Sequence, residues 1–528
     1  MRFAFLFCLL LAFSATAIAA GVDRVKNRVT LSLTSEPPSL DTSLSSDTTS
    51  SFILNLTNEG LVTVGPRGEI LPGVAERWDV EPTRLTFHLR ADARWSDGVA
   101  VTADDFVYAF RRLVDPATAA AGSTFFAYII RNAEAILKGE MAPDTLGVRA
   151  ETPRRLVVDL ALPAPYALWV LTGTPYMPLR QDFVTSLDGR FGANAEHLLY
   201  NGPFVLARWV HNASMVLNRN PDYWNSREIK LDGIDIGYIT ADTRSLFNLY
   251  KSGELAALRL DENVLKDASA AGFRIQKAPT NCLAWLILNM DQERPTKNKK
   301  LREAIRLAFD RDRYVNNIVG LPGTEKIDSV FTRRIKGVSS AFQTEHPAPE
   351  IPFDIPAARA LLAEARAEMG VAELPPLILL ANETRQIEAE FIQSQLKMAL
   401  GLDIRVDKQT FKQSIAKMRS GDFDIARAGF CGGALMDPVF FAGIFSSNSP
   451  YNDGGFADAE YDRLMQVTHS TADQSVRMQA FAQLQQILFD EVPIIPTHEN
   501  AWIYVQDPGV RDFRRFPVTD FSRGFITP

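Results

Sequence analysis

Two widely separated cysteines are the residues of this chain whose type most directly suggests chemistry. Cys431 lies in the stretch 423-FDIARAGFCGGALMDP-438, between an aromatic residue and a glycine pair at the end of a predicted strand. A cysteine in such a place can be a catalytic thiol, a metal ligand or one half of a disulfide. The chain holds only three cysteines, at positions 8, 282 and 431, so each alternative implies a different kind of protein.

The N-terminal residues predict export and thereby limit these alternatives. The segment MRFAFLFCLLLAFSATAIAAG has one basic residue, an apolar run from Phe3 to Phe13, and small residues at Ala17 and Ala19. This is the pattern of a cleavable signal peptide, here over residues 1–20. Cys8 lies inside the apolar run and lacks the preceding small residue of a lipoprotein signal. We therefore expect a periplasmic protein without a lipid anchor.

Export changes what the cysteines can do. Once the signal peptide is removed, Cys282 and Cys431 remain as an even pair in an oxidising compartment, and the simplest prediction is a disulfide. Such a bond would close a loop of about 150 residues and stabilise the fold by at most roughly 5 kcal/mol in the chain-entropy model. Two free buried thiols are the alternative at this point.

A search for catalytic motifs finds none of the common ones. The sequence contains no G-x-S-x-G elbow, P-loop, glycine-rich dinucleotide fingerprint or C-x-x-C pair. The six histidines have no ligand-like spacing, and His498-Glu499 lacks the second histidine of a zinc-binding helix. We therefore expect no catalytic residue, no metal and no cofactor. A secreted hydrolase or a chaperone-like protein stays as an alternative of another class.

Composition and charge exclude other kinds of partner. The 528 residues are 46% hydrophobic and 23% charged, with a net charge of −7, which is ordinary globular composition and long enough for two to four domains. No long basic block is present, so we expect no nucleic-acid partner. No stretch reaches the run of about 18 apolar residues that a membrane-spanning helix needs.

Strands and helices alternate in both halves of the chain. Strands are predicted at 28–33, 84–90, 156–162, 203–210, 214–220, 284–290, 377–381, 403–407 and 423–430, and helices at 101–113, 299–310, 356–369, 385–400, 411–420, 457–467 and 473–490, after which comes the stretch 492–505. The clearest helix start is Thr102, because Asp105 three residues later completes an approximate capping box. This alternation indicates an α/β fold with two lobes.

Several motifs occur together in one order. They are 36-EPPSLD-41, 58-NEGLV-62, 72-PGVAERW-78, 85-LTFHLRADARWSDGVAVTADDFVYAFRRLVDP-116, 145-TLGVRA-150, 201-NGPFVLARWV-210, 217-LNRNPDYW-224, 251-KSGEL-255, 302-REAIRLAFDRD-312 and 423-FDIARAGFC-431. With these motifs the chain resembles the oligopeptide-binding proteins of bacterial ABC importers, the large solute-binding proteins of family 5. The resemblance covers nearly all of the chain after the signal peptide.

The resemblance implies an α/β periplasmic binding protein with two lobes, an additional small domain and a ligand cleft between the lobes. Lobe I would comprise residues 21–60, 183–281 and 501–528, the small domain 61–182, and lobe II 282–500. The ligand would be an extended peptide, held mainly through main-chain hydrogen bonds. A monomer would then deliver it to an ABC permease in the inner membrane.

The resemblance also implies the site residues. They are Glu36, Pro37, Phe411, Arg427, Gly429, Phe430, Cys431, Gly433, Asp437 and His498, with a disulfide between Cys282 and Cys431. Arg427 would lie near the carboxylate end of the ligand, unless it is an ordinary strand arginine paired at the surface.

This sequence departs from the family at the ligand site. The family has an aspartate two residues after the cysteine, where it pairs with the α-ammonium of the ligand, whereas this chain has Gly433. Asp437 is the local carboxylate that would replace it. Phe430 and Phe411 stand where the family has tryptophans, and 497-THEN-500 replaces a tyrosine-rich run. A buried ammonium without a counter-charge costs several kcal/mol. A second hypothesis therefore keeps the scaffold but gives it an N-blocked peptide, a murein fragment or a non-peptide solute as ligand.

Overall fold

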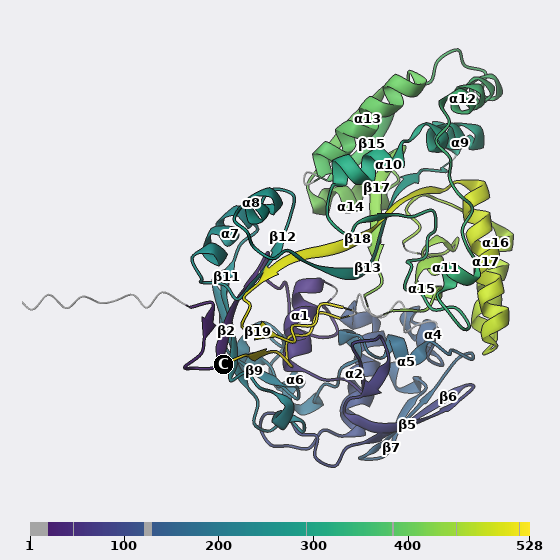
Figure 1. Cartoon of the computed structure of the whole chain (residues 1–528). Coiled ribbons are helices and arrows are strands. Elements are labelled where there is room, and N and C mark those ends of the chain that lie inside the picture. Colours follow the sequence, from purple (N-terminus) through teal and green to yellow (C-terminus); the bar gives the residue numbers. More distant parts are fainter. Residues whose placement is uncertain are drawn as a thin grey trace, which may run out of the picture.

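Figure 1 shows a computed structural model of the whole chain. The described residues are 20–45, 47–120, 129–291, 293–382, 385–433, 435–449, 451–516 and 518–528, and the side chains of Phe411 and Lys412 are not among them. The expected signal peptide thus lies outside the described residues except for Ala20. No helix within the described ranges is long and apolar enough to cross a membrane.

Lobe I is built on a five-stranded sheet in the order β1-β2-β11-β10-β9. The elements are β1 (Val22–Asp23), β2 (Arg28–Leu33), α1 (Thr48–Thr57), β9 (Phe204–Val210), β10 (Ser214–Arg219), β11 (Gly233–Ile239), α7 (Thr243–Lys251), β12 (Ala257–Leu260) and α8 (Leu265–Ala270). β9 and β10 form the predicted hairpin, and β2 runs parallel to β11. The C-terminal strands β19 (Val510–Arg511) and β20 (Phe525–Ile526) pair with each other.

The additional small domain contains a four-stranded antiparallel sheet in the order β5-β6-β8-β7. Its elements are β3 (Val62–Val64), β4 (Ile70–Pro72), β5 (Ala75–Glu81), β6 (Arg84–Leu89), α2 (Ala103–Val114), α4 (Ala133–Leu137), β7 (Val148–Thr152), β8 (Arg155–Asp159), α5 (Ala167–Val170) and α6 (Gln181–Ser186). The predicted capping box at the start of α2 is confirmed, since the backbone N–H of Thr102 donates to Asp105 at 2.8 Å.

Lobe II is built on a seven-stranded sheet whose main path is β12-β18-β13-β17-β15-β16, so that β12, from the range expected for lobe I, forms one edge of it. Its strands are β13 (Gln276–Leu288), β14 (Glu325–Lys326), β15 (Leu377–Asn382), β16 (Ile404–Gln409), β17 (Ile425–Cys431) and β18 (Ile494–Gln506). The helices are α9 (Lys299–Ala308), α10 (Arg311–Arg313), α11 (Phe342–Glu345), α12 (Ile355–Met369), α13 (Gln386–Leu400), α14 (Phe411–Arg419), α15 (Val439–Ala442), α16 (Ala459–Ser470) and α17 (Gln474–Glu491). Apolar side chains from α9, α12 and α13 and from the strands form one core of the lobe.

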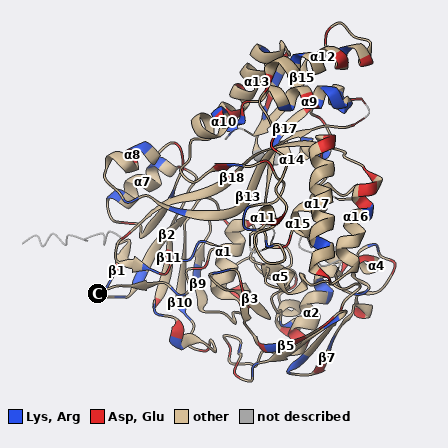
Figure 2. Cartoon of the chain, turned by 45° about the vertical axis from the view of Figure 1, so that its right-hand side comes forward, with Lys and Arg blue, Asp and Glu red and all other residues tan. Residues whose placement is uncertain are grey.

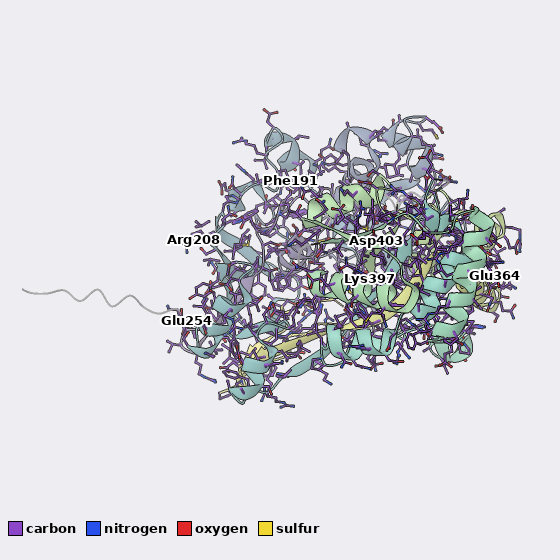
Figure 3. The ribbon with its side chains drawn as sticks, turned by 90° about the horizontal axis from the view of Figure 1, so that it is seen from above. Phe191, Arg208, Glu254, Glu364, Lys397 and Asp403 are labelled. Atoms are coloured by element: carbon purple, nitrogen blue, oxygen red, sulfur yellow. A yellow bond between two sulfur atoms is a disulfide. The ribbon has the colours of Figure 1, made fainter. Side chains whose placement is uncertain are left out.

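The two longest strands, β13 and β18, pass from one lobe to the other. They lie side by side in Figure 1, with α7 and α8 near one end and α9 and α12 near the other. Figure 3, seen from above, shows β18 running between the side of Glu254 in lobe I and that of Glu364 on α12. The strands cross two of the expected domain boundaries, and one core cluster joins the small domain to lobe II. The expected division into domains stays a prediction.

Charged residues of both signs are interspersed along the described ribbon in Figure 2. One example of paired surface charges is Lys300 on α9, which lies within ion-pair distance of Glu364 and Glu368 on α12. Exposed pairs of this kind contribute little to stability.

Candidate functional site

Strand β17 has one edge that is largely unpaired. Its residues Ile425–Cys431 pair antiparallel with β13 along their whole length. On the other edge β15 pairs only at Ile425 and Ala426, so no strand of the described chain covers Arg427 to Cys431 there. Gly429 and Cys431 are exposed. An open edge presents backbone N–H and C=O groups to which another extended chain can pair.

The open edge lies where several parallel strands end. β16 runs parallel to β15, and β15 runs parallel to β17, so the carboxyl ends of all three point the same way. Helices α13 and α14 begin a few residues after β15 and β16. In open α/β sheets, ligands bind in the crevice outside the carboxyl ends of the strands. The end of β17 is therefore the candidate site.

The disulfide predicted between Cys282 and Cys431 is confirmed. The two cysteines are directly opposite each other on β13 and β17, with their Cα atoms 3.9 Å apart, and their sulfurs are bonded. The alternatives of a catalytic thiol, a metal ligand and two free thiols are thereby excluded. The bond ties the open end of β17 to its neighbour.

Gly433 lies just beyond the end of the strand and offers open space. Its φ is +54°, and a β-carbon placed on it would meet no atom within 4 Å. Aspartate tolerates this left-handed backbone conformation better than most residues do. The absence of the family's aspartate is therefore not forced by crowding at this position.

The structure corrects the expectation for Asp437. Both of its carboxylate oxygens accept hydrogen bonds from the guanidinium of Arg477, at 2.8 and 2.9 Å, and the Arg477 side chain is 0% exposed. The backbone N–H of Val439 also donates to Asp437 at 3.0 Å. A carboxylate that neutralises a buried guanidinium is not free to bind a ligand's ammonium. Asp437 therefore does not replace the missing anchor.

Arg427 belongs to a buried cluster that the sequence did not reveal. Its Nε donates to Glu388 Oε2 at 3.0 Å, and the two side chains are 12% and 8% exposed. Arg385 donates to the other oxygen of Glu388 at 2.8 Å, and the Tyr314 hydroxyl also donates to Glu388. Burial raises the pKa of Glu388, but the charges of Arg427 and Arg385 outweigh it and lower the pKa to about 2. Arg427 is thus paired, but away from the surface.

His498 lies beside this cluster and is fully buried. Its ring centroid is 6.0 Å from that of Tyr314, and its Nε2 is 3.1 Å from Asn500 Oδ1. Burial, reinforced by the charge of Arg427, lowers the pKa of His498 to about 3. His498 is therefore neutral near pH 7. The sequence signal that could have indicated this cluster is Glu388, an acidic residue in the first turn of the helix after the buried strand β15.

The remaining expected residues lie on several elements of the fold. Glu36 accepts hydrogen bonds from Trp209 Nε1 at 2.7 Å and from the Asn212 backbone at 3.1 Å, so its carboxylate braces the β9–β10 turn. Pro37 is buried. Phe430 packs against Phe441, with ring centroids 5.4 Å apart.

Two expected residues on lobe II complete the set. Gly429 has no room for a side chain, because a β-carbon would lie 2.5 Å from the Leu283 carbonyl oxygen of β13. Phe411 begins α14, but its side chain lies outside the described residues. Contact of either residue with a ligand stays a prediction.

A cavity of the molecule has a different lining. A cavity of about 520 Å³ lies between residues 55–71 and the C-terminal residues 512–525, and its lining includes none of the expected ligand residues. No group of three or more potential metal ligands occurs in the described part of the chain. The open edge of β17 remains the candidate.

Comparison with known proteins decides the family. The model of the bacterial extracellular solute-binding proteins, family 5, matches residues 69–453. The chain belongs to this family. It is 28% identical over 495 residues to the dipeptide-binding protein DppE of Bacillus subtilis, covering 92% of this chain and 88% of DppE. It is 30% identical over 497 residues to the periplasmic oligopeptide-binding protein OppA of Haemophilus influenzae, covering 89% and 88%.

Solved structures support the same fold. The structure of Haemophilus influenzae OppA in complex with the peptide RPPGFSPFR matches with a TM-score of 0.82 and 27% identity, over 96% of this chain and 100% of that one. The two-lobed α/β architecture expected from the sequence is therefore confirmed.

Proposed function

We propose that this chain is the solute-binding component of an ABC importer, that it captures extended peptides on the open edge of β17, and that it delivers them to a membrane permease. The observation that carries the proposal is the unpaired edge from Arg427 to Cys431 at the carboxyl ends of parallel strands. An extended peptide that adds to this edge gains main-chain hydrogen bonds whatever its side chains are. Family membership and the peptide named in the OppA complex support the ligand class.

The proposal extends to where and how the protein acts. It places the chain in the periplasm as a monomer, exported by the signal peptide at residues 1–20 and without a nucleic-acid partner. It also makes the protein a binder that releases its ligand unchanged. N-terminal sequencing of the mature protein tests the first point, and incubation with peptides followed by mass spectrometry tests the second. Cleavage of any peptide would restore the hydrolase alternative.

Calorimetric titration tests the ligand class. The probes are equimolar mixtures of tripeptides to pentapeptides, one set with free amino termini and one set acetylated. The proposal expects saturable binding of at least one set, with micromolar or tighter affinity. The absence of binding to both sets, by a protein stripped of co-purified ligand and shown to be folded, would contradict it.

A second candidate keeps the scaffold and changes the ligand. Gly433 supplies no carboxylate, and Asp437 is committed to Arg477, so the described loop after β17 offers no evident partner for a free α-ammonium group. This favours a ligand without such a group, namely an N-blocked peptide, a murein fragment or a non-peptide solute. Tighter binding of the acetylated set than of the free set supports this candidate, and the reverse order removes it.

A further inference from the structure

Strand β13 is interrupted by a bulge at the point where it passes between the lobes. Pro279 pairs with Ala501, and the next pair is Leu283 with Glu499. The three residues Thr280–Cys282 thus lie opposite the single residue Asn500, to whose carbonyl the Thr280 hydroxyl donates at 2.6 Å. Bulges are places where a strand bends.

Different hydrophobic cores pack against the strands before and after this bulge. On the lobe I side, Ile503 and Val505 of β18 pack in a core with Leu246 and Ala268 of helices α7 and α8. On the lobe II side, Leu286 of β13 packs in the core that contains the side chains of α9, α12 and α13. Because the cores on the two sides are separate, a change of angle between the lobes is absorbed most readily here.

Asn281 sits in the bulge and uses both ends of its side chain and its backbone carbonyl. Its Nδ2 donates to the Gly433 carbonyl at 3.3 Å and to the Leu435 carbonyl at 2.8 Å, and its backbone carbonyl accepts from the Gly432 N–H at 2.7 Å. The Thr332 hydroxyl donates to its Oδ1. The side chain is buried, at 2% exposure. Residues Gly432, Gly433 and Leu435, which follow the open edge of β17, are thereby fixed to the bulge.

The contact between Asn281 and the residues after β17 is closely packed at Gly432. A β-carbon on Gly432 would lie 2.8 Å from Asn281 Nδ2 and 2.9 Å from the ring of Phe441. The neighbouring Cys282–Cys431 disulfide adds a covalent link one residue further along each strand. The end of the ligand-binding edge and the bulge therefore move as one unit.

Asn289 provides a natural comparison at the other end of the same strand pair. Its Nδ2 donates to the Gly421 and Phe423 carbonyls at 3.0 and 2.9 Å, and it is 1% exposed. It thus holds the turn before β17 as Asn281 holds the residues after it. Only Asn281 lies where the strands pass from one lobe to the other. Variants at the two asparagines can therefore distinguish a general structural role from a role in coupling the lobes.

We propose that Asn281 is a positioning residue that couples occupation of the β17 edge to the angle between the lobes. A ligand that orders the residues after β17 acts through the Asn281 amide on the bulge, and so biases the lobes toward closure. The bulge in turn sets where these residues stand relative to the edge. This inference rests on the proposed function, because it takes the β17 edge as the ligand site.

Hydrogen–deuterium exchange of the ligand-free mature protein tests the coupling without knowledge of the ligand. In Asn281→Ser, exchange should rise about tenfold both in the segment from Gly432 to Met436 and in the segment from Asn500 to Trp502. In Asn289→Ser it should rise by a similar factor only around Gly421–Phe423. Unchanged exchange from Asn500 to Trp502 in Asn281→Ser would overturn the proposal.

Two further variants show whether the effect of Asn281→Ser comes from the loss of the amide donors of Asn281 or from a general loosening of the fold. Asn281→Asp keeps the acceptor for Thr332 but turns a carboxylate oxygen toward the Gly433 and Leu435 carbonyls, so it should raise exchange in the same segments at least as much as Asn281→Ser does. Thr332→Val removes only the hydroxyl that donates to Asn281 and should leave the Gly432–Met436 segment within about twofold of wild type. Equal effects of Thr332→Val and Asn281→Asp would assign Asn281 a merely structural role and overturn the proposal.

Titration with the two peptide mixtures tests the consequence for binding. Asn281→Asp should weaken binding by about tenfold or more, whereas Asn289→Ser should stay within about twofold of wild type. Equal losses in both variants would contradict the coupling. If wild type binds neither mixture, the proposed function fails, while the exchange experiment still decides whether Asn281 links the edge to the bulge.

Discussion

At the scale of single residues, we propose that Gly433 determines how the amino end of a ligand is recognised. Gly433→Asp introduces a carboxylate into open space where the backbone conformation accepts it. We expect affinity for peptides with free amino termini to rise by about tenfold to a hundredfold, the value of a charge-assisted hydrogen bond. Titration of the two peptide sets measures the change. Gly433→Asn controls for shape without charge, and an equal gain in both variants would contradict the argument.

The lowered pKa of Glu388 predicts a specific dependence of the free energy of unfolding on pH. The folded-state pKa of Glu388 is lowered from 4.5 to about 2 by Arg427 and Arg385 against the effect of burial. Its contribution to the free energy of unfolding is therefore fully present above pH 4.5 and is lost as the pH falls toward 2. We expect Glu388→Gln to cost about 3 kcal/mol at pH 7, because it leaves Arg427 buried without its partner.

Urea unfolding of wild type and Glu388→Gln at several pH values measures this difference. The gap between the two proteins should be constant from pH 7 to 5 and should narrow between pH 4.5 and the acid limit of folding. Glu390→Gln, on the exposed side of the same helix, is the control and should change the free energy of unfolding by less than about 0.5 kcal/mol. A gap that widens in acid would refute the assigned charge state.

At the scale of elements, the Cys282–Cys431 bond ties the end of β17, the proposed ligand edge, to β13. The bond spans 149 residues of chain, and a loop of this size is worth at most about 5 kcal/mol. We expect the double variant Cys282→Ser/Cys431→Ser to melt at a lower temperature than wild type without reductant. Wild type with reductant should approach the variant. An equal melting temperature with and without reductant would argue against a stabilising bond.

Local sequence patterns predicted most of the helices and strands. The boundaries that they did not predict depend on tertiary contacts. The capping box at Thr102 and the hairpin at 203–220 needed only local signals and are confirmed. Strand β13 begins at Gln276, eight residues before the predicted start at 284. Its first part carries polar residues without alternation, because pairing with β18 and not burial of one face makes it a strand.

The candidate site was predictable only in part. The disulfide followed from the even cysteine pair and from the resemblance. The partner of Asp437, by contrast, is Arg477, forty residues away on α17, and no local signal joins them. The open edge of β17 depends on where β15 ceases to pair, which is a property of the assembled sheet. The role proposed for Asn281 likewise arises from loops that meet only in the folded chain.

At the scale of the whole molecule, two strands connect the lobes, and the ligand edge lies beside their bulge. In the proposed function, an extended ligand at this place would contact the bulge on which we propose that the angle between the lobes depends. Capture and release of the ligand would then follow from a change of shape.

The central claim is that an extended ligand pairs with the edge of β17, and hydrogen–deuterium exchange tests it most directly. The protein is compared as isolated with co-purified ligand, and after unfolding and refolding have removed that ligand. The account predicts that backbone amides between Arg427 and Cys431 exchange more slowly in the loaded protein, while the turn at Gly421–Phe423 is unchanged. Loaded protein whose β17 amides exchange as fast as those of the stripped protein would contradict it.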